Sequence, residues 1–208
     1  MTRNPCRVIP MLIGAMAVLF SVPHAAAAGP LEKTAVTVFN PPVPSGPQRS
    51  GECWTDSIAV ARAGAWRCMV GNEIYDPCFS NQHLSGVVIC DANPATGRRG
   101  FLLKLSKPLP QPSSERIAHP RPWLLKLADG SICEIQTGTT AFVAGLVVPY
   151  DCSDSHECTD NGCPYMTGLT GKLKRGRSWI ADKVAFSSSD QGLKLLSRKR
   201  VAVVAVWE

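Results

Sequence analysis

Four carboxylates stand close together between residues 151 and 160, and carboxylate oxygens are the hard ligands that calcium prefers. Their spacing does not follow an EF-hand loop, because His156 stands where that loop needs a glycine and no glutamate closes it. The alternative is a solvated hairpin tip, closed by a disulfide between two nearby cysteines. The segment is therefore a candidate calcium site, with the ligands Asp151, Asp154, Glu157 and Asp160.

A second candidate is a short basic run before Trp179, in which four lysines and arginines fall between Lys172 and Arg177. Cationic side chains beside an aromatic ring can bind anionic polymers, such as nucleic acid or the phosphates of a cell envelope. The alternative is a solvated loop with no ligand. The candidate binding residues of this run are Lys174, Arg175 and Trp179.

A third candidate combines aromatic and charged side chains between residues 54 and 76. An arginine stacked on a tryptophan is a common binding arrangement. It is equally a common way to cover a hydrophobic core. The candidate binding residues here are Trp54, Arg62 and Trp66 on a predicted helix, with Asp76 downstream.

Catalytic motifs are weak in this sequence, which has no GxSxG, HExxH, P-loop or GxGxxG pattern. A serine could still meet an acid and one of His83, His119 or His156 in space, because such triads do not depend on sequence order. Two acids could likewise form a glycosidase pair. The sequence thus favours binding over catalysis, with no cofactor expected, and leaves a hydrolase as the alternative.

The N-terminus has the three parts of a secretory signal peptide over residues 1–28. Arg3 and Arg7 precede an apolar run over residues 8–20, and four alanines end the segment. The run is shorter than the roughly 20 residues that span a bilayer, although an uncleaved anchor is the alternative. We therefore expect a secreted or periplasmic protein with no transmembrane span after cleavage.

Cleavage would remove Cys6 and leave eight of the nine cysteines, and an even number in an exported chain indicates disulfides. Thiolate zinc sites are not favoured, because the chain has no CxxC pair. The cysteines form two clusters, so we expect neighbours to pair. The expected disulfides are Cys53–Cys68, Cys78–Cys90, Cys133–Cys152 and Cys158–Cys163. No thiol nucleophile would then remain.

The positioning elements follow from hydrophobic periodicity. Ile58, Ala61 and Ala65 recur at helical spacing and predict a helix that stops at Gly71. The rest of the chain favours short strands, of which the clearest are two runs joined by the Asp129-Gly130 turn. Further strands are expected at residues 86–90, 101–105, 144–150, 178–186 and 200–207.

The predicted fold class is mainly β with a short helical segment (α+β), built as an antiparallel β-barrel or sandwich and stabilised by disulfides. The predicted organisation is a signal peptide at 1–28, a proline-rich linker at 29–52, a disulfide-bound helical segment at 53–95 and an antiparallel β-domain at 100–208.

The pattern CW-x3-IA-x2-R-x3-AWRC-x2-GN-x-I-x-DPCF, from Cys53 to Phe79, resembles a segment of uncharacterised secreted bacterial proteins. The resemblance continues in the hairpin before Cys133 and in a closing strand with Trp207. It implies export and a two-part fold, but no activity. The segment DCSDSHECTDNGC departs from that pattern and looks like an insertion.

These observations predict an exported binding or inhibitory protein of the cell envelope or extracellular space, with a protein or glycan as partner. Removing residues 1–28 takes away only Arg3 and Arg7, so the formal net charge falls from +6 to +4. Such a mild charge does not favour nucleic acid as the partner. The alternatives are an envelope-directed hydrolase and a structural envelope component.

Overall fold

The computed structural model describes residues 32–112, 121–155 and 163–208, and over these residues the chain is all β. The predicted signal peptide at 1–28 lies outside the described residues. Residues Leu31–Glu208 form one compact unit. In the described part of the chain, no helix is long and apolar enough to cross a membrane.

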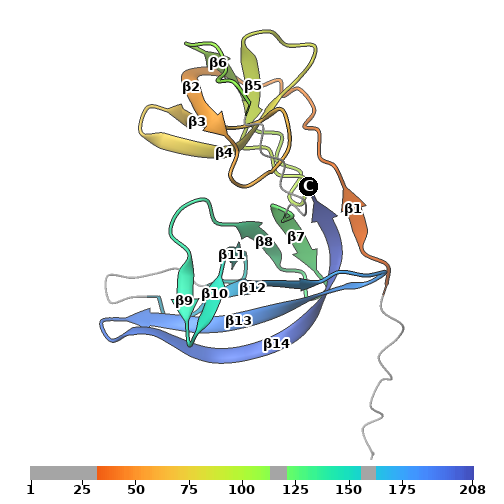
Figure 1. Cartoon of the computed structure of the whole chain (residues 1–208), viewed down its shortest axis with the longest axis vertical. Coiled ribbons are helices and arrows are strands. Elements are labelled where there is room, and N and C mark those ends of the chain that lie inside the picture. Colours follow the sequence, from red (N-terminus) through yellow and green to blue (C-terminus); the bar gives the residue numbers. More distant parts are fainter. Residues whose placement is uncertain (1–31, 113–120, 156–162) are drawn as a thin grey trace, which may run out of the picture. The chain divides into compact units, whose positions relative to one another are not determined.

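A first closed barrel is built from five consecutive strands (Figure 1). Neighbouring strands run antiparallel, and the last returns to pair parallel with the first at Gln48↔Leu102. The core holds two disulfides, Trp66 and Phe101. The five strands are β2 (Gln48–Asp56), β3 (Ala65–Val70), β4 (Glu73–Ser80), β5 (Val87–Cys90) and β6 (Phe101–Leu105).

The predicted helix is wrong, because the segment forms the end of β2, a turn and β3. Gly64, with φ at 80°, leads into β3, which pairs with β2 on one side and β4 on the other. These ladders satisfy the backbone hydrogen bonds that a helix would have made internally. Ile58, one of the residues whose spacing predicted the helix, is 59% exposed. The β6 strand also joins this barrel, although its residues were assigned to the later domain.

A second barrel follows, with the strand order β14-β13-β12-β11-β8-β7 and a pairing of β14 with β7 that closes it. The β1 strand (Ala35–Thr37) pairs parallel with the end of β14. Tyr150 is fully buried inside the barrel and donates a hydrogen bond to the Pro122 carbonyl at 2.7 Å. The strands are β7 (Leu124–Leu127), β8 (Ile132–Ile135), β11 (Tyr150–Cys152), β12 (Met166–Lys174), β13 (Trp179–Ser189) and β14 (Gly192–Trp207).

The predicted hairpin around the Asp129-Gly130 turn is confirmed by the antiparallel pairing of β7 with β8. Gly130 has φ at 90°, which a glycine adopts without strain. The strand predicted at residues 200–207 is the end of β14, which pairs with β13 and with β7. The mainly β barrel with disulfides is therefore confirmed, and only its helical part is not.

A short hairpin of β9 (Ala141–Val143) and β10 (Leu146–Val148) packs beside β12–β14 (Figure 1). Val143 and Val148 are buried against Val184 and Phe186 of β13. The residue before each of these valines, Phe142 on β9 and Val147 on β10, points to the opposite side of the hairpin. Their side chains are 65% and 54% exposed. The hairpin thus has a buried inner face and an exposed apolar outer face.

Three of the four expected disulfides are confirmed: Cys53–Cys68, Cys78–Cys90 and Cys133–Cys152. Each joins two residues that lie directly opposite each other on neighbouring antiparallel strands. The fourth expected pair includes Cys158, which lies outside the described residues. Three disulfides fit an oxidising extracellular or periplasmic environment.

Candidate functional site

The positive charge of the chain is concentrated on the strands β12–β14 and the turns between them. Residues 171–200 contain nine lysines and arginines against two aspartates, a formal net charge of +7, whereas the whole chain carries +6. All but the buried Lys183 are exposed. This asymmetry creates a positive potential on one part of the surface. The exposed cations are Lys172, Lys174, Arg175, Arg177, Lys194, Arg198, Lys199 and Arg200.

A cavity of about 490 Å³ opens on this basic surface. It lies on the outside of the second barrel, because its residues Ile180 and Asp182 alternate with Ala181, which is fully buried in the barrel core. We call this cavity the basic groove. Its lining consists of three cations, two half-buried aliphatic side chains and one acid: Lys172, Lys174, Arg200, Leu173, Ile180 and Asp182.

The register of the strands explains how these side chains meet. Lys174 pairs with Ile180 across β12 and β13, and Asp182 pairs with Arg200 across β13 and β14. An irregularity in β12 between Leu169 and Leu173 interrupts the ladder next to the groove. Such irregularities change the direction of nearby side chains, and Lys172 and Lys174, which lie at or just after this one, line the groove.

Asp182 neutralises only part of this charge. Its carboxylate lies 2.6 Å from Arg198 Nη2, and 3.9 Å from Arg200 Nε. The Arg200 side chain is 86% exposed, so its ion pair is weak. Within the described ranges, neither Lys172 nor Lys174 has a carboxylate oxygen within 4.0 Å. The groove thus presents net positive charge above an aliphatic lining.

The neighbouring pair of Arg175 and Trp179 serves the fold instead. Trp179 is 7% exposed and belongs to the core of the second barrel. The guanidinium carbon of Arg175 lies 4.9 Å from the centre of its ring, which is cation–π distance. Of the predicted basic site, the structure therefore places Lys174 in the groove and turns Trp179 inward.

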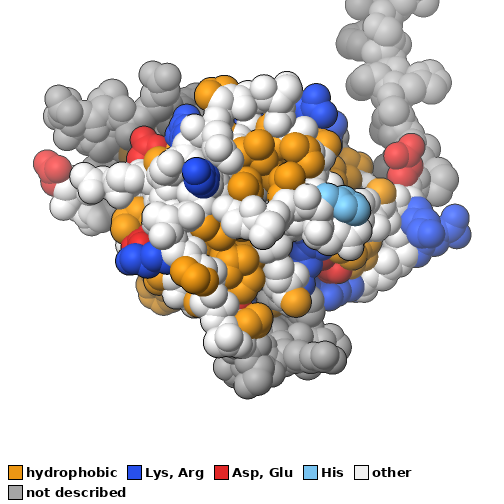
Figure 2. Space-filling view, turned by 90° about the horizontal axis from the view of Figure 1, so that it is seen from above, with side chains coloured by type: hydrophobic (Ala, Val, Ile, Leu, Met, Phe, Trp, Pro, Cys, Tyr) orange, Lys and Arg blue, Asp and Glu red, His pale blue; other side chains and the backbone are white. Residues whose placement is uncertain are grey.

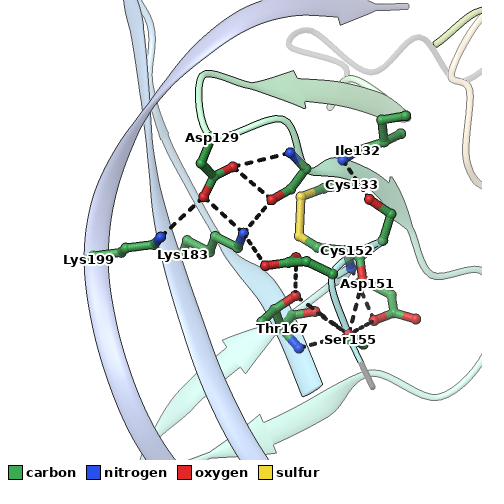
Figure 3. The surroundings of a disulfide bond; sticks show 12 residues. Asp129, Ile132, Cys133, Asp151, Cys152, Ser155, Thr167, Lys183 and Lys199 are labelled. Atoms are coloured by element: carbon green, nitrogen blue, oxygen red, sulfur yellow. Dashed lines mark hydrogen bonds and ion pairs between the residues drawn. A yellow bond between two sulfur atoms is a disulfide. The ribbon is translucent and has the colours of Figure 1, made fainter. Parts of the chain in front are cut away.

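The acidic segment meets a buried lysine next to the Cys133–Cys152 disulfide (Figure 3). Lys183 is 2% exposed, and its ammonium donates to Asp154 at 2.7 Å and to Asp129 at 3.0 Å. Asp154 also accepts a hydrogen bond from Thr167 Oγ1 at 2.5 Å. We call these four residues and Ser131 the Lys183 cluster.

The expected calcium ligands are only partly placed. Asp154 is already neutralised by Lys183, and Asp151 accepts hydrogen bonds from its neighbour's backbone and from Ser155. Glu157 and Asp160 lie outside the described residues. The calcium site stays a prediction, for which Lys183 would be a competing cation.

The electrostatics of the Lys183 cluster argue for a structural role. Burial alone would lower the pKa of Lys183, but the hydrogen bonds to Asp154 and Asp129 outweigh it and raise the pKa. Burial alone would raise the pKa of Asp154, but the bonds from Lys183 and Thr167 outweigh it and lower that pKa. The Ser131 hydroxyl also contacts the ammonium. A serine–lysine nucleophile would need a neutral amine, and the two carboxylates keep Lys183 charged.

The candidates in the first barrel have mostly structural partners. Trp66 is 4% exposed and donates to Ser80 Oγ at 2.6 Å. Arg62 donates to the Phe39 carbonyl, and its guanidinium carbon lies 5.0 Å from the Phe79 ring centre. Trp54 remains 43% exposed. On the face of the molecule that Figure 2 shows, hydrophobic side chains gather in patches, and lysines and arginines lie around them.

Asp76 anchors the turn that follows β2. Its carboxylate is fully buried, accepts hydrogen bonds from Ser57 Oγ and the Ile58 amide, and lies 3.5 Å from Arg67. Ser57 Oγ in turn accepts from the Val60 amide at 2.9 Å. Burial raises the pKa of Asp76, and these hydrogen bonds offset part of that rise.

A second cavity, of about 220 Å³, is lined by several carboxyl groups, and the hydrolase alternative would need such a pair of acids. Asp76, Asp91 and Glu134 line it with Arg98, and burial raises the pKa of Glu134 as well. Among the described residues, the His83 ring forms a hydrogen bond with the Gln82 side chain, and the other candidate histidines, His119 and His156, lie outside them. The hydrolase stays a prediction.

No protein-family model, no curated protein and no solved structure matches this chain. The resemblance to uncharacterised secreted proteins therefore stays a prediction. What the fold and the site define is an all-β, disulfide-bonded protein of two closed barrels, one of which carries a basic groove. Arg200, Ile180 and Asp182 of that groove were missed by the sequence reasoning. The charge count of residues 171–200 was the signal that could have found this surface.

Proposed function

We propose that this is an exported binding protein whose basic groove binds an anionic component of the cell envelope. The observation that carries the proposal is a cavity of about 490 Å³ lined by Lys172, Lys174 and Arg200, within a segment, residues 171–200, whose formal net charge is +7. The lining of Leu173 and Ile180 adds apolar contacts to the charge. A ligand with phosphate or carboxylate groups and an apolar portion would match both features.

The charge of the rest of the chain also supports binding at the basic groove. Without residues 1–28 and 171–200, the formal charge is −3, so repulsion would keep the rest of the molecule away from an anionic ligand. Export is supported by the disulfides, which persist in oxidising compartments. The cations attract the ligand over a Debye length of about 8 Å at physiological salt, and the groove determines where it binds.

The test is binding of the oxidised, exported protein to heparin, a soluble polyanion, at increasing salt. We expect an affinity that falls with salt, because salt screens the attraction between the groove cations and heparin and makes the release of heparin's bound counterions less favourable. The double variant Lys172→Glu/Lys174→Glu should weaken binding at least about tenfold, as two charge reversals at partly exposed sites imply.

The matched control is Lys104→Glu/Lys126→Glu, which makes the same charge change at exposed residues on β6 and β7. This variant should lose much less affinity. Equal losses in the two double variants, or an affinity that does not respond to salt, would refute a groove-centred site.

A further inference from the structure

We propose that the occupant of the basic surface is an anionic phospholipid bilayer, with the β9–β10 hairpin entering its interface beside the basic groove. This inference rests on the proposed function and deepens it, because it names the component of the envelope. Two observations carry it: the exposed apolar face of the hairpin, and the cations Lys172, Lys174, Arg198 and Arg200 on the same side of the second barrel.

The first observation is that the hairpin displays two large apolar side chains that the core does not use. Phe142 and Val147 are direct cross-strand partners, and they are 65% and 54% exposed. The inner face of the hairpin is held by Val143 and Val148, which are 0% and 1% exposed. The outer pair is therefore presented on an anchored support rather than on a loose loop. A single exposed apolar residue is ordinary, but two adjacent exposed apolar residues on one hairpin are typical of interaction sites.

The second observation is that the hairpin and the groove share one face of the sheet. Along β13, Ile180, Asp182 and Val184 alternate with buried barrel residues, so their side chains point to the same outer side. Ile180 and Asp182 line the groove, whereas Val184 lies under the hairpin. Arg198 pairs with Val184 and Arg200 pairs with Asp182, so both arginines belong to this face.

Charge complementarity selects the bilayer. Each lysine or arginine near an anionic lipid surface increases the affinity of the protein for that surface by about fivefold. Stable attachment of a peripheral protein needs a second signal in addition to charge. Phe142 and Val147 supply that second signal, because apolar side chains next to cations enter the region of headgroups and acyl chains. A soluble polyanion would use the cations and leave the hairpin in water.

The experiment is flotation of the oxidised, exported protein with two kinds of vesicle. One is phosphatidylcholine alone, and the other is phosphatidylcholine mixed with phosphatidylglycerol. We expect binding to the anionic vesicles and little binding to the neutral ones. Phe142→Ser/Val147→Ser should weaken vesicle binding at least about tenfold and leave heparin binding unchanged, since it removes apolar contacts and no charge.

A matched control is Val38→Ser/Ile58→Ser, which changes two residues of similar exposure, 58% and 59%, on other segments. It should bind vesicles as the unaltered protein does. Thermal melting should confirm that the hairpin variant folds, because both altered side chains are exposed.

The outcomes separate the two proposals. Retained heparin binding without binding to anionic vesicles would overturn the bilayer and leave the proposed function standing. Vesicle binding that survives Phe142→Ser/Val147→Ser but is lost in Lys172→Glu/Lys174→Glu would overturn the role of the hairpin. The proposal is supported if Lys172→Glu/Lys174→Glu loses both heparin and vesicle binding, while Phe142→Ser/Val147→Ser loses vesicle binding alone.

Discussion

Lys183 shows how a single residue can appear functional and serve the fold. It lies inside the second barrel, where its ammonium contacts two aspartates and a serine hydroxyl. A buried cation without partners would be costly, and the two carboxylates remove that cost. The acidic segment was singled out for its carboxylates, and the tertiary structure gives Asp154 a lysine as its partner.

Lys183→Met tests this role. The change leaves Asp129 and Asp154 close together without their shared cation, and we expect a loss of roughly 2 kcal/mol in the free energy of unfolding at pH 7. That is below the ~3–5 kcal/mol of a broken, fully buried pair, since both carboxylates are partly exposed. Urea denaturation measures the loss, and Lys194→Met, at an exposed position, is the control.

The same cluster predicts a pH dependence. The folded-state pKa of Asp154 is lowered, so its contribution to stability is present above the unfolded pKa of about 4 and is lost as the pH falls toward the folded value. The unaltered protein should therefore lose stability between pH 5 and pH 2, values that bracket an unfolded pKa of about 4. Lys183→Met should flatten this part of the profile; an identical slope in both proteins would argue against the ion pairs.

At the scale of the element, the backbone of β2 passes very near β3 at Gly51 in the first barrel. A Cβ on Gly51 would lie 2.1 Å from the carbonyl oxygen of Met69, which no side chain can tolerate without moving the strands. Gly51 thus has a packing role in the parallel closure of β2 against β6. Nothing in the local sequence distinguishes it from Gly46, another glycine of the proline-rich segment.

Gly51→Ala should consequently destabilise the protein by about 2 kcal/mol, within the ~1–3 kcal/mol of overpacked sites. Gly46→Ala is the control, because its Cβ would meet nothing within 4 Å. We expect that variant to be neutral or slightly stabilising, since alanine restricts the unfolded chain. Thermal denaturation compares the two, and equal melting temperatures would contradict the close approach.

The disulfides also act at the scale of the element, as cross-strand clamps. Cys53–Cys68 closes a separation of 15 residues between β2 and β3. Replacing both cysteines by alanine should cost about 3 kcal/mol, because the unfolded chain regains the loop entropy. Urea denaturation of Cys53→Ala/Cys68→Ala checks this, with the reduced protein as a second reading. A loss below about 1 kcal/mol would mean that strand pairing alone holds the barrel.

At the scale of the whole molecule, charge and cross-linking are divided along the chain. Two of the three described disulfides stabilise the first barrel, and the positive charge lies on the last strands of the second. A uniform distribution of the same charges would produce only a mild field. Their concentration on β12–β14 makes salt-sensitive binding to an anionic partner the expected behaviour of the molecule.

The sequence by itself determined the features that are local. The Asp129-Gly130 turn specifies its hairpin because few residue pairs adopt that turn, and neighbouring cysteines pair because their strands are joined by short connections. The tertiary structure alone decided the features that depend on long-range pairing. The helical spacing around Ala61 did not produce a helix, because β3 pairs with both β2 and β4. Lys174 and Arg200 are 26 positions apart in the sequence, and they meet in the groove only because β13 lies between their strands.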